Sequence, residues 1–221
     1  AARLGRWDQA ELLLAETVAA AGSNSSNGIG VLARSCAQQA GPPALARRAF
    51  AVAVASGTAD AATLRDALSA SAVGGEFALG LELLYGCAAG VLPLEPAGVA
   101  TGGAGSAGSA GSAAPLTSLA TLALDVNVQR VAATLHAGCG DSAAAVDALR
   151  RVRRAQNEAP PLDTQGRQPA SSPRLALQLM PADLEAIVLA CAREGRWRDV
   201  RWLMRAVMEE EEACTPVAAA V

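Results

Sequence analysis

A glycine-anchored pattern recurs along this chain of 221 residues and constrains its fold more than any other feature. In each copy a small or branched residue lies five places after the glycine, and a larger apolar residue lies nine places after it. The anchoring glycines are Gly5, Gly41, Gly75, Gly140 and Gly195. The first two steps between them are about 35 residues long, and each of the two longer steps contains a low-complexity segment. We therefore predict a repeat with a period of about 35 residues.

An apolar segment of helical length precedes every anchoring glycine except the first. These segments are residues 29–40, 61–73, 128–137 and 182–193. Each repeat is expected to be a hairpin of two helices, with the glycine in the turn between them. The small residue after the glycine allows neighbouring helices to cross closely. Because one hairpin cannot bury its apolar stripe alone, the pattern predicts an α-solenoid of stacked hairpins.

The composition favours an all-α fold. Hydrophobic residues make up 52% of the chain, but only 3% of the residues are aromatic, and alanine is the commonest residue. Alanine is the best helix former, whereas strands favour aromatic and β-branched residues. We expect helical repeats over 1–95 (a half unit plus two hairpins), 116–157 and 174–213. The other segments are a Gly/Ser/Ala linker at 96–115, a Pro-rich loop at 158–173 and a tail at 214–221.

The sequence holds no pattern typical of an enzyme or a metal site. The cysteines are odd in number and far apart, which favours small buried residues in a reducing compartment. His136 is the only histidine, and we expect it to be buried. The Gly-rich stretch at 102–111 lacks the Lys-Ser/Thr ending of a phosphate-binding loop. We expect no catalysis, cofactor, metal or small-molecule substrate, and, because no apolar run reaches about 18 residues, a soluble protein without a membrane partner.

Two stretches carry a resemblance to a known family. Residues 62–84 (ATLRDALSASAVGGEFALGLELL) and 182–210 (ADLEAIVLACAREGRWRDVRWLMRAVMEE) resemble pentatricopeptide repeats. The match includes Ser71 and Cys191, each four places before its glycine, and the amphipathic second helix. Tetratricopeptide repeats fit less well, because their usual Trp, Leu-Gly and Tyr set is missing. The resemblance implies an RNA partner in a mitochondrion or, alternatively, a chloroplast, and the Ala, Gly and Arg bias looks green-algal. The chain begins with Ala1 rather than Met, which leaves a preceding presequence or further repeats open.

In the pentatricopeptide family, polar residues at the fifth place of the first helix and at the last place of each unit read RNA bases. The resemblance puts the fifth place at Leu32, Asp66, Val131 and Ala186, and the residues before units two and three are Asn27 and Ala61. Only Asp66 and Asn27 suit base contact. The places that would sandwich a base are Ile29, Thr63, Val128 and Asp183. The chain thus departs from the readable code.

Arginine is the clearer source of an RNA contact. The net charge is −3, but all 18 basic residues are arginine, and residues 126–208 contain 12 of them against 8 acidic residues. We predict phosphate contacts from two clusters: Arg150, Arg151, Arg153 and Arg154; and Arg198, Arg201 and Arg205. Alternatives stay open: cations at a helix C-terminus, a solvated face pairing with Glu194 and Asp199, and a GC-rich genome as the source of the arginines.

The two C-terminal tryptophans receive opposite predictions. Trp197 corresponds to Trp7 and Phe77 in the repeat, so we expect it in the core. Trp202 lies where the other units have mostly polar residues, so we expect an exposed, partner-facing side chain.

These observations lead to one expected function and two alternatives. We expect a non-catalytic, RNA-contacting architectural subunit of an organellar ribonucleoprotein, with a mitochondrial ribosome component as the leading form. Its partners would be ribosomal RNA, held through the phosphate backbone, and neighbouring proteins. The alternatives are a freestanding organellar RNA maturation or translation factor and a tetratricopeptide-like protein–protein scaffold.

Overall fold

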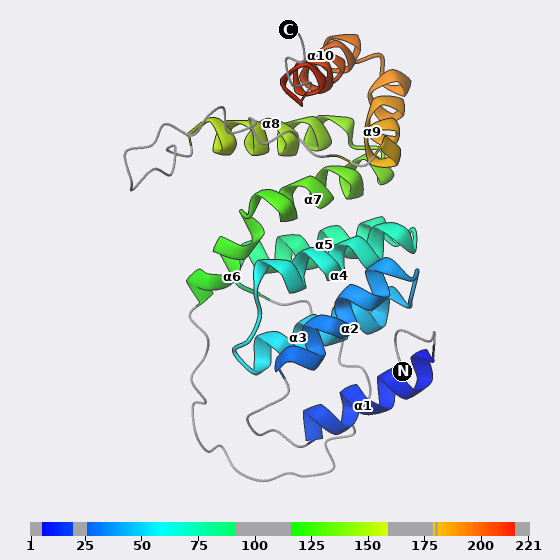
Figure 1. Cartoon of the computed structure of the whole chain (residues 1–221), viewed down its shortest axis with the longest axis vertical. Helices are drawn as coiled ribbons and strands as arrows, with labels where there is room; N and C mark the ends of the chain where they lie inside the picture. Colours follow the sequence, from blue (N-terminus) through cyan, green and yellow to red (C-terminus); the bar gives the residue numbers. More distant parts are fainter. Residues whose placement is uncertain (1–5, 20–25, 92–115, 159–178, 180, 215–221) are drawn as a thin grey trace, which may run out of the picture. The chain divides into compact units, whose positions relative to one another are not determined.

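A computed structural model describes residues 6–19, 26–91, 116–158, 179 and 181–214. All regular structure within these ranges is α-helical, so the prediction of an all-α chain is confirmed (Figure 1). The predicted linker at 96–115, the loop at 159–173 and the tail beyond 214 lie outside the described residues. The chain divides into two compact units, Ala1–Val128 and Gln129–Val221, which we describe separately as unit 1 and unit 2.

Most helices of both units come in pairs joined by short turns. In chain order they are α1 (Trp7–Ala19), α2 (Ser26–Gln38), α3 (Pro43–Ala55), α4 (Ala61–Val73), α5 (Phe77–Ala88), α6 (Leu116–Ala123), α7 (Val126–Gly138), α8 (Ser142–Glu158), α9 (Pro181–Arg193) and α10 (Trp197–Cys214). The hairpins α2–α3, α4–α5, α7–α8 and α9–α10 contain the four predicted first helices, now α2, α4, α7 and α9. The short helix α6 was not predicted as a separate element.

The turns explain why glycine spacing marks the hairpins. Gly75, Gly140 and Gly195 have φ of 74°, 82° and 69°, in the left-handed region that glycine adopts without a steric penalty. The following backbone N–H bonds back across the end of the first helix, as in Glu76 N–H to Ser71 O at 2.9 Å. The α2–α3 turn is one residue longer, and there Ala40 takes the left-handed conformation with φ of 49°. Gly41 is therefore not needed for a left-handed conformation, unlike the glycines of the other three turns.

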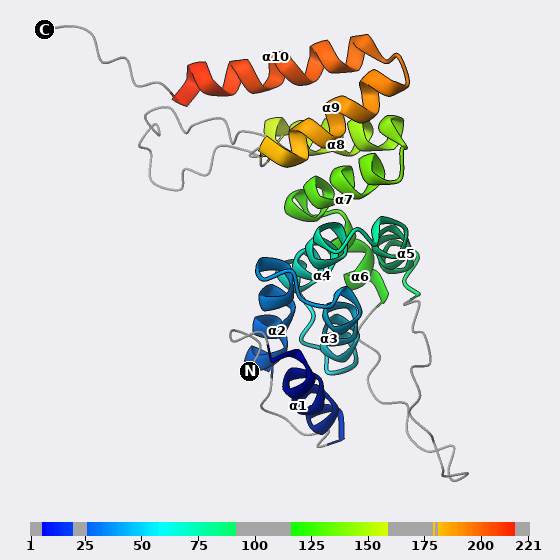
Figure 2. The ribbon, with the colours of Figure 1, turned by 90° about the vertical axis from the view of Figure 1, so that its right-hand side faces the viewer.

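In unit 1 the helices α2, α3 and α4 pack against one another (Figure 2). Helix α5 packs on α4 and on α6, and α1 packs on α3. The fully buried side chains include Phe50, Leu64 and Leu68 together with alanines. Those alanines are Ala33, Ala46, Ala49 and Ala67. Small side chains thus let these helix axes approach closely, as the composition predicted.

Successive elements of unit 1 meet where a helix begins beside the next turn. The Trp7 ring covers Gly41 so closely that a Cβ there would lie 2.6 Å from the ring atom Cη2. Pro43 covers Gly74 in the same manner, with its Cγ inside contact distance of a Cβ at that glycine. Ion pairs join the same elements: Arg48 with Glu11, and Arg47 with Glu76 at 2.5 Å. Glycine is therefore required at positions 41 and 74, because the Trp7 and Pro43 rings leave no room for a Cβ there.

In unit 2 the α9–α10 hairpin is held on α7 and α8 by polar contacts. Ser142 at the start of α8 donates its hydroxyl to Glu194 in the α9–α10 turn, at 2.6 Å. Arg150 of α8 donates to Asp199 of α10 at 2.7 Å. Asp183 of α9 accepts a hydrogen bond from Thr134 of α7. Leu149, Ile187 and Leu203 form the apolar contact surface among these helices.

We predict that Gly41→Ala lowers the free energy of unfolding by about 1–3 kcal/mol, because the added methyl group would displace the Trp7 ring or separate α1 from α3. Urea titration followed by circular dichroism measures this. Gly28→Ala is the matched control, since Gly28 lies in α2 with nothing within 4 Å of an added Cβ. The control should raise the free energy of unfolding by about 0.5–1 kcal/mol. Equal effects of the two variants would contradict the packing argument.

Candidate functional site on helix α10

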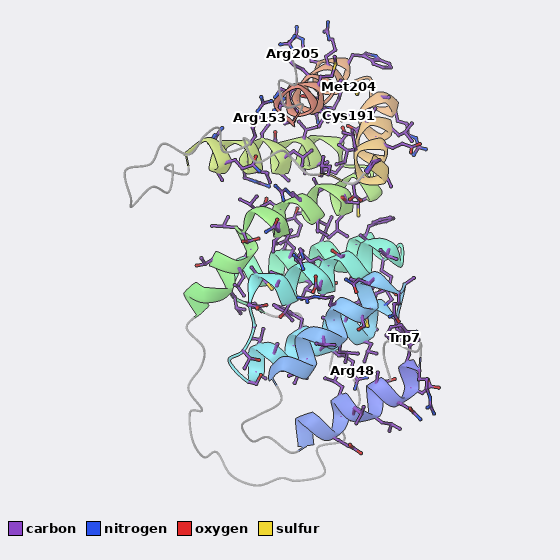
Figure 3. The ribbon with its side chains drawn as sticks, viewed as in Figure 1. Trp7, Arg48, Arg153, Cys191, Met204 and Arg205 are labelled. Carbon is purple, nitrogen blue, oxygen red and sulfur yellow. The ribbon has the colours of Figure 1, made fainter. Side chains whose placement is uncertain are left out.

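The arginine cluster of α8 is only partly available to a ligand. Arg150 donates to Asp147 at 3.1 Å and to Asp199 at 2.7 Å, and its guanidinium lies 5.5 Å from the centre of the Trp202 ring. Arg151 donates to Gln129 of α7 at 3.2 Å. Arg153 is half-buried on α8 (Figure 3), and Arg154 is exposed. Arg150 thus links α8 to α10, and a joint phosphate contact of the four arginines stays a prediction.

Three exposed arginines of α10 are available. Arg198, Arg201 and Arg205 make no ion pair with any residue that the structure describes. The alternative pairing with Asp199 holds for the neighbouring Arg196, whereas Arg198, Arg201 and Arg205 pair with neither Asp199 nor Glu194. Their spacing of three and four residues puts them on one side of the helix. In Figure 3 the Arg205 side chain extends away from α10.

Beside these arginines, α10 carries an apolar stripe in contact with solvent. Trp197 is 61% exposed, Met204 is 46% exposed and Met208 is 58% exposed. Residues seven and four apart on a helix share a face, so the three form one row. The prediction of a core position for Trp197 is wrong. Its counterpart Trp7 is covered because Gly41 of the following turn lies against it, whereas no described residue takes that place at Trp197.

Trp202 is half-buried, so the prediction of an exposed, partner-facing tryptophan is also wrong. The face of its indole ring meets the Arg150 guanidinium, which is a cation–π contact. Asp199 lies beside the same guanidinium and fixes it. Trp202 thus belongs to the contact between α8 and α10, and the exposed tryptophan of this helix is Trp197.

Asp66 is not free to read a base. Its side chain is 7% exposed, and it accepts from Arg65 at 2.6 Å and from Arg34 at 3.3 Å. This pairing connects α2 with α4. Asn27 lies in α2, and its side chain is outside the described residues. Ile29, Leu32 and Val128, which the resemblance assigned to base recognition, are buried.

The acidic side chains that line the cleft between α2 and α4 already accept hydrogen bonds from neighbouring residues. Gly30, Arg34, Thr58, Asp60 and Asp66 are among its lining residues. Asp60 caps α4 by accepting from the Thr63 N–H at 2.7 Å and from the Thr63 hydroxyl at 2.6 Å. Partial burial raises the pKa of Asp60, but these hydrogen bonds, with Arg34 and Arg65 nearby, leave the pKa below its ordinary value. The carboxylate therefore acts as a helix cap.

Three of the described thiols and the histidine are buried. Burial raises the pKa of the Cys36 thiol to about 11 and that of Cys87 to about 12, so neither is a nucleophile at neutral pH. Cys191 is buried as predicted, but Cys139 is exposed, and the side chain of Cys214 lies outside the described residues. Within the described ranges, His, Cys, Asp and Glu side chains form no group of three that could hold a metal ion, and no helix has the length and apolar content of a membrane span.

Comparisons of this chain with protein-family models, curated proteins and solved structures gave no match. Its function is therefore proposed below from its own residues.

We predict that Asp199→Asn lowers the free energy of unfolding by about 1–3 kcal/mol, because it removes the negative charge and one of the two largely buried acceptor oxygens that Arg150 and Arg196 share. Thermal unfolding followed by circular dichroism tests this. Asp147→Asn removes the exposed partner of the same arginine and should cost at most about 1 kcal/mol. A larger loss in the Asp147 variant would show that Asp199 is not the residue that holds α8 on α10.

We also predict that stability rises with pH as the pH approaches about 6.5 from below, through His136. Burial lowers the pKa of this histidine, and Arg151 lowers it further, although Asp141 opposes both. The unfolded chain, with an ordinary histidine pKa of about 6.5, therefore binds the proton more readily than the folded chain. The slope can reach at most about 1.4 kcal/mol per pH unit. Urea titrations across this range should show a smaller slope for His136→Gln, and an unchanged slope would contradict the assignment.

Proposed function

We propose that this protein is a non-catalytic, RNA-contacting architectural subunit of an organellar ribonucleoprotein, with a mitochondrial ribosome as the leading particle and a chloroplast one as the alternative. The observation that carries the RNA contact is the exposed row of Arg198, Arg201 and Arg205, which have no acidic partner among the described residues. A guanidinium group can donate two parallel hydrogen bonds to the oxygens of one phosphate, and the release of counterions from RNA favours such contacts.

The contrast with the other arginines supports this assignment. Arg34, Arg47, Arg48, Arg65, Arg150 and Arg196 all pair with carboxylates. Internal pairing satisfies those guanidinium groups within the fold. Arg198, Arg201 and Arg205 lie together on one exposed side of α10 without such a pair among the described residues, so they are available to an external anion.

We propose that the hairpins form an α-solenoid similar to a degenerate pentatricopeptide array. The proposal is supported by four hairpins, three of which have turns of the same length with a left-handed glycine, and by the recurring contact between the start of a helix and the next turn. In such an array the phosphate-binding row would lie on a second helix, away from the places where the family reads bases.

The burial of Asp66, Leu32 and Ile29 favours a structural role over sequence-specific regulation. Phosphate contacts position a protein on RNA but carry no direct sequence information. A folded RNA offers a fixed arrangement of phosphates, so shape and charge suffice for its recognition. A maturation factor would instead require exposed polar groups at the base-reading places.

One observation favours a second candidate function, a protein–protein scaffold. Trp197, Met204 and Met208 form an exposed apolar row on α10, and such rows usually contact another macromolecule. An architectural subunit can contain both kinds of contact, whereas a pure scaffold would bind no RNA.

The RNA contact is tested by fluorescence anisotropy with single-stranded and structured RNAs, at several salt concentrations. We predict that Arg198→Glu/Arg205→Glu weakens binding by about tenfold or more, equally across sequences, and makes the salt dependence shallower. Arg6→Glu/Arg193→Glu is the matched control, because both residues are exposed and the charge change is the same. Equal losses in both double variants, or no binding by the wild-type chain, would contradict an RNA site on α10. Strong discrimination among sequences would favour a maturation factor.

The assembly is tested by sedimentation of the endogenous protein from organelle lysate. An architectural subunit should migrate with a ribosomal subunit in high salt and leave that position when RNase breaks the particle. Small complexes that RNase does not affect would favour the scaffold, and free or RNase-released migration would favour the maturation factor.

A further inference from the structure

Several helices that follow an anchoring glycine contact the next element through a recurring set of places. The first is the second residue after the anchoring glycine. Trp7 covers Gly41, Pro43 covers Gly74, and Ser142 donates to Glu194. In each case this residue begins a helix and its contact lies in the turn of the next hairpin.

Two further places recur along the same helices. The residue six places after the glycine forms an ion pair with the following element in unit 1, as Glu11 does with Arg48 and Arg47 does with Glu76. The residue nine places after the glycine is a large apolar side chain. It is buried in α1, α3, α5 and α8, where it is Leu14, Phe50, Leu84 and Leu149.

Helix α10 carries side chains suited to all three places, but none of them is covered by a described residue. The three are Trp197, Arg201 and Met204, and we call them the docking face. Trp197 is exposed, Arg201 is exposed without an ion pair among the described residues, and Met204 is exposed. The opposite side of α10 is buried through Asp199, Leu203 and Ala206. The helix thus has one face packed on its own hairpin and α8, and one face ready for another element.

We propose that the docking face binds a helical hairpin of a partner protein, in the position that the α4–α5 hairpin takes on α3. The proposal does not depend on the RNA contact. Its chemistry follows from the equivalent contacts: Gly41 and Gly74 leave no room for a Cβ beneath Trp7 and Pro43. The partner's turn therefore carries glycine opposite Trp197.

The charge of Arg201 adds a second requirement. Arg47 at the equivalent place pairs with Glu76, which directly precedes α5. The partner therefore carries an acidic residue just before its second helix, opposite Arg201. Apolar side chains of the partner cover Met204 and its neighbour Met208, because removing both thioethers from water favours association.

The phosphate-binding row and the docking face are separate enough to act together. At about 100° per residue, Arg198 and Arg205 lie roughly a quarter of a turn from the line through Trp197 and Met204. Arg201 lies between these two sides of the helix. It belongs to the docking face because it is six places after its glycine, as the ion-paired Glu11 and Arg47 are. RNA can thus contact one flank of α10 while a protein hairpin packs on the other.

The test uses the full chain and a labelled synthetic peptide of residues 60–90, which contains the α4–α5 sequence with Gly74 and Glu76. Because a single hairpin cannot bury its apolar stripe alone, the peptide should become helical only on docking, and circular dichroism should show a gain of helix on mixing. Fluorescence anisotropy should detect binding at peptide concentrations up to about 100 μM. Arg201→Glu should weaken binding by about tenfold, and a peptide with Glu76→Lys should restore binding to that variant. Met204→Glu should abolish binding of both peptides, because a charge would enter the apolar contact.

Arg198→Glu and Arg205→Glu are the matched controls and should change peptide binding by less than about twofold. No binding by the wild-type chain overturns the proposal. Equal losses in Arg201→Glu and Arg198→Glu, or no restoration by the charge-swapped peptide, overturn it too, because the contact would then be general electrostatic attraction. Sedimentation velocity of the chain alone gives the remaining outcome: self-association that Met204→Glu removes assigns the face to a second copy and overturns the partner hairpin. RNA binding by Met204→Glu should stay unchanged, which separates this test from that of the proposed function.

Discussion

The close approach between the start of one helix and the turn of the next hairpin links successive elements of unit 1. Gly41 lies beneath the Trp7 ring and Gly74 lies beneath Pro43, with no space for a Cβ at either position. This closeness brings Arg47 and Arg48 within reach of Glu76 and Glu11. It also allows alanines rather than bulky side chains to fill the helix crossings. A chain with few aromatic residues can therefore form a continuous core.

The same closeness decides what the arginines can do. Where one hairpin packs on another within a unit, carboxylates of one element form ion pairs with arginines of the other. Asp66 pairs with Arg34, and Asp199 pairs with Arg150. These pairs orient the helices and add modestly to stability, since at least one partner of each is solvated. The arginines of α10 beyond Arg196 have no such neighbour among the described residues. These arginines are thus available to a ligand because no described element packs against their side of α10.

The sequence predicted the helical hairpins well because their turns depend on local backbone conformation. Gly75, Gly140 and Gly195 mark the ends of their first helices to within a residue or two. Gly41 marked its hairpin for a different reason, since Ala40 takes the left-handed conformation and Gly41 is required by the Trp7 ring. The pattern could not separate these two causes, because both select a residue without a Cβ.

The burial of individual side chains could not be predicted in this way. Trp197 and Trp7 have the same local sequence environment, and only the presence of a following turn distinguishes a covered ring from an exposed one. Asp66 suited base contact by its place in the first helix, but Arg34 lies 32 residues away in sequence and meets it only in the folded chain. Trp202 is half-buried, the reverse of its predicted exposure, because Arg150 of α8 lies over its ring. Local sequence sets the backbone of each hairpin, whereas the neighbouring element sets which side chains the hairpin exposes. Trp197, Arg201 and Met204 of α10 are exposed, although the residues at the same distances from a glycine in α1 and α3 are covered or paired, and this difference points to an interaction surface more directly than residue type does.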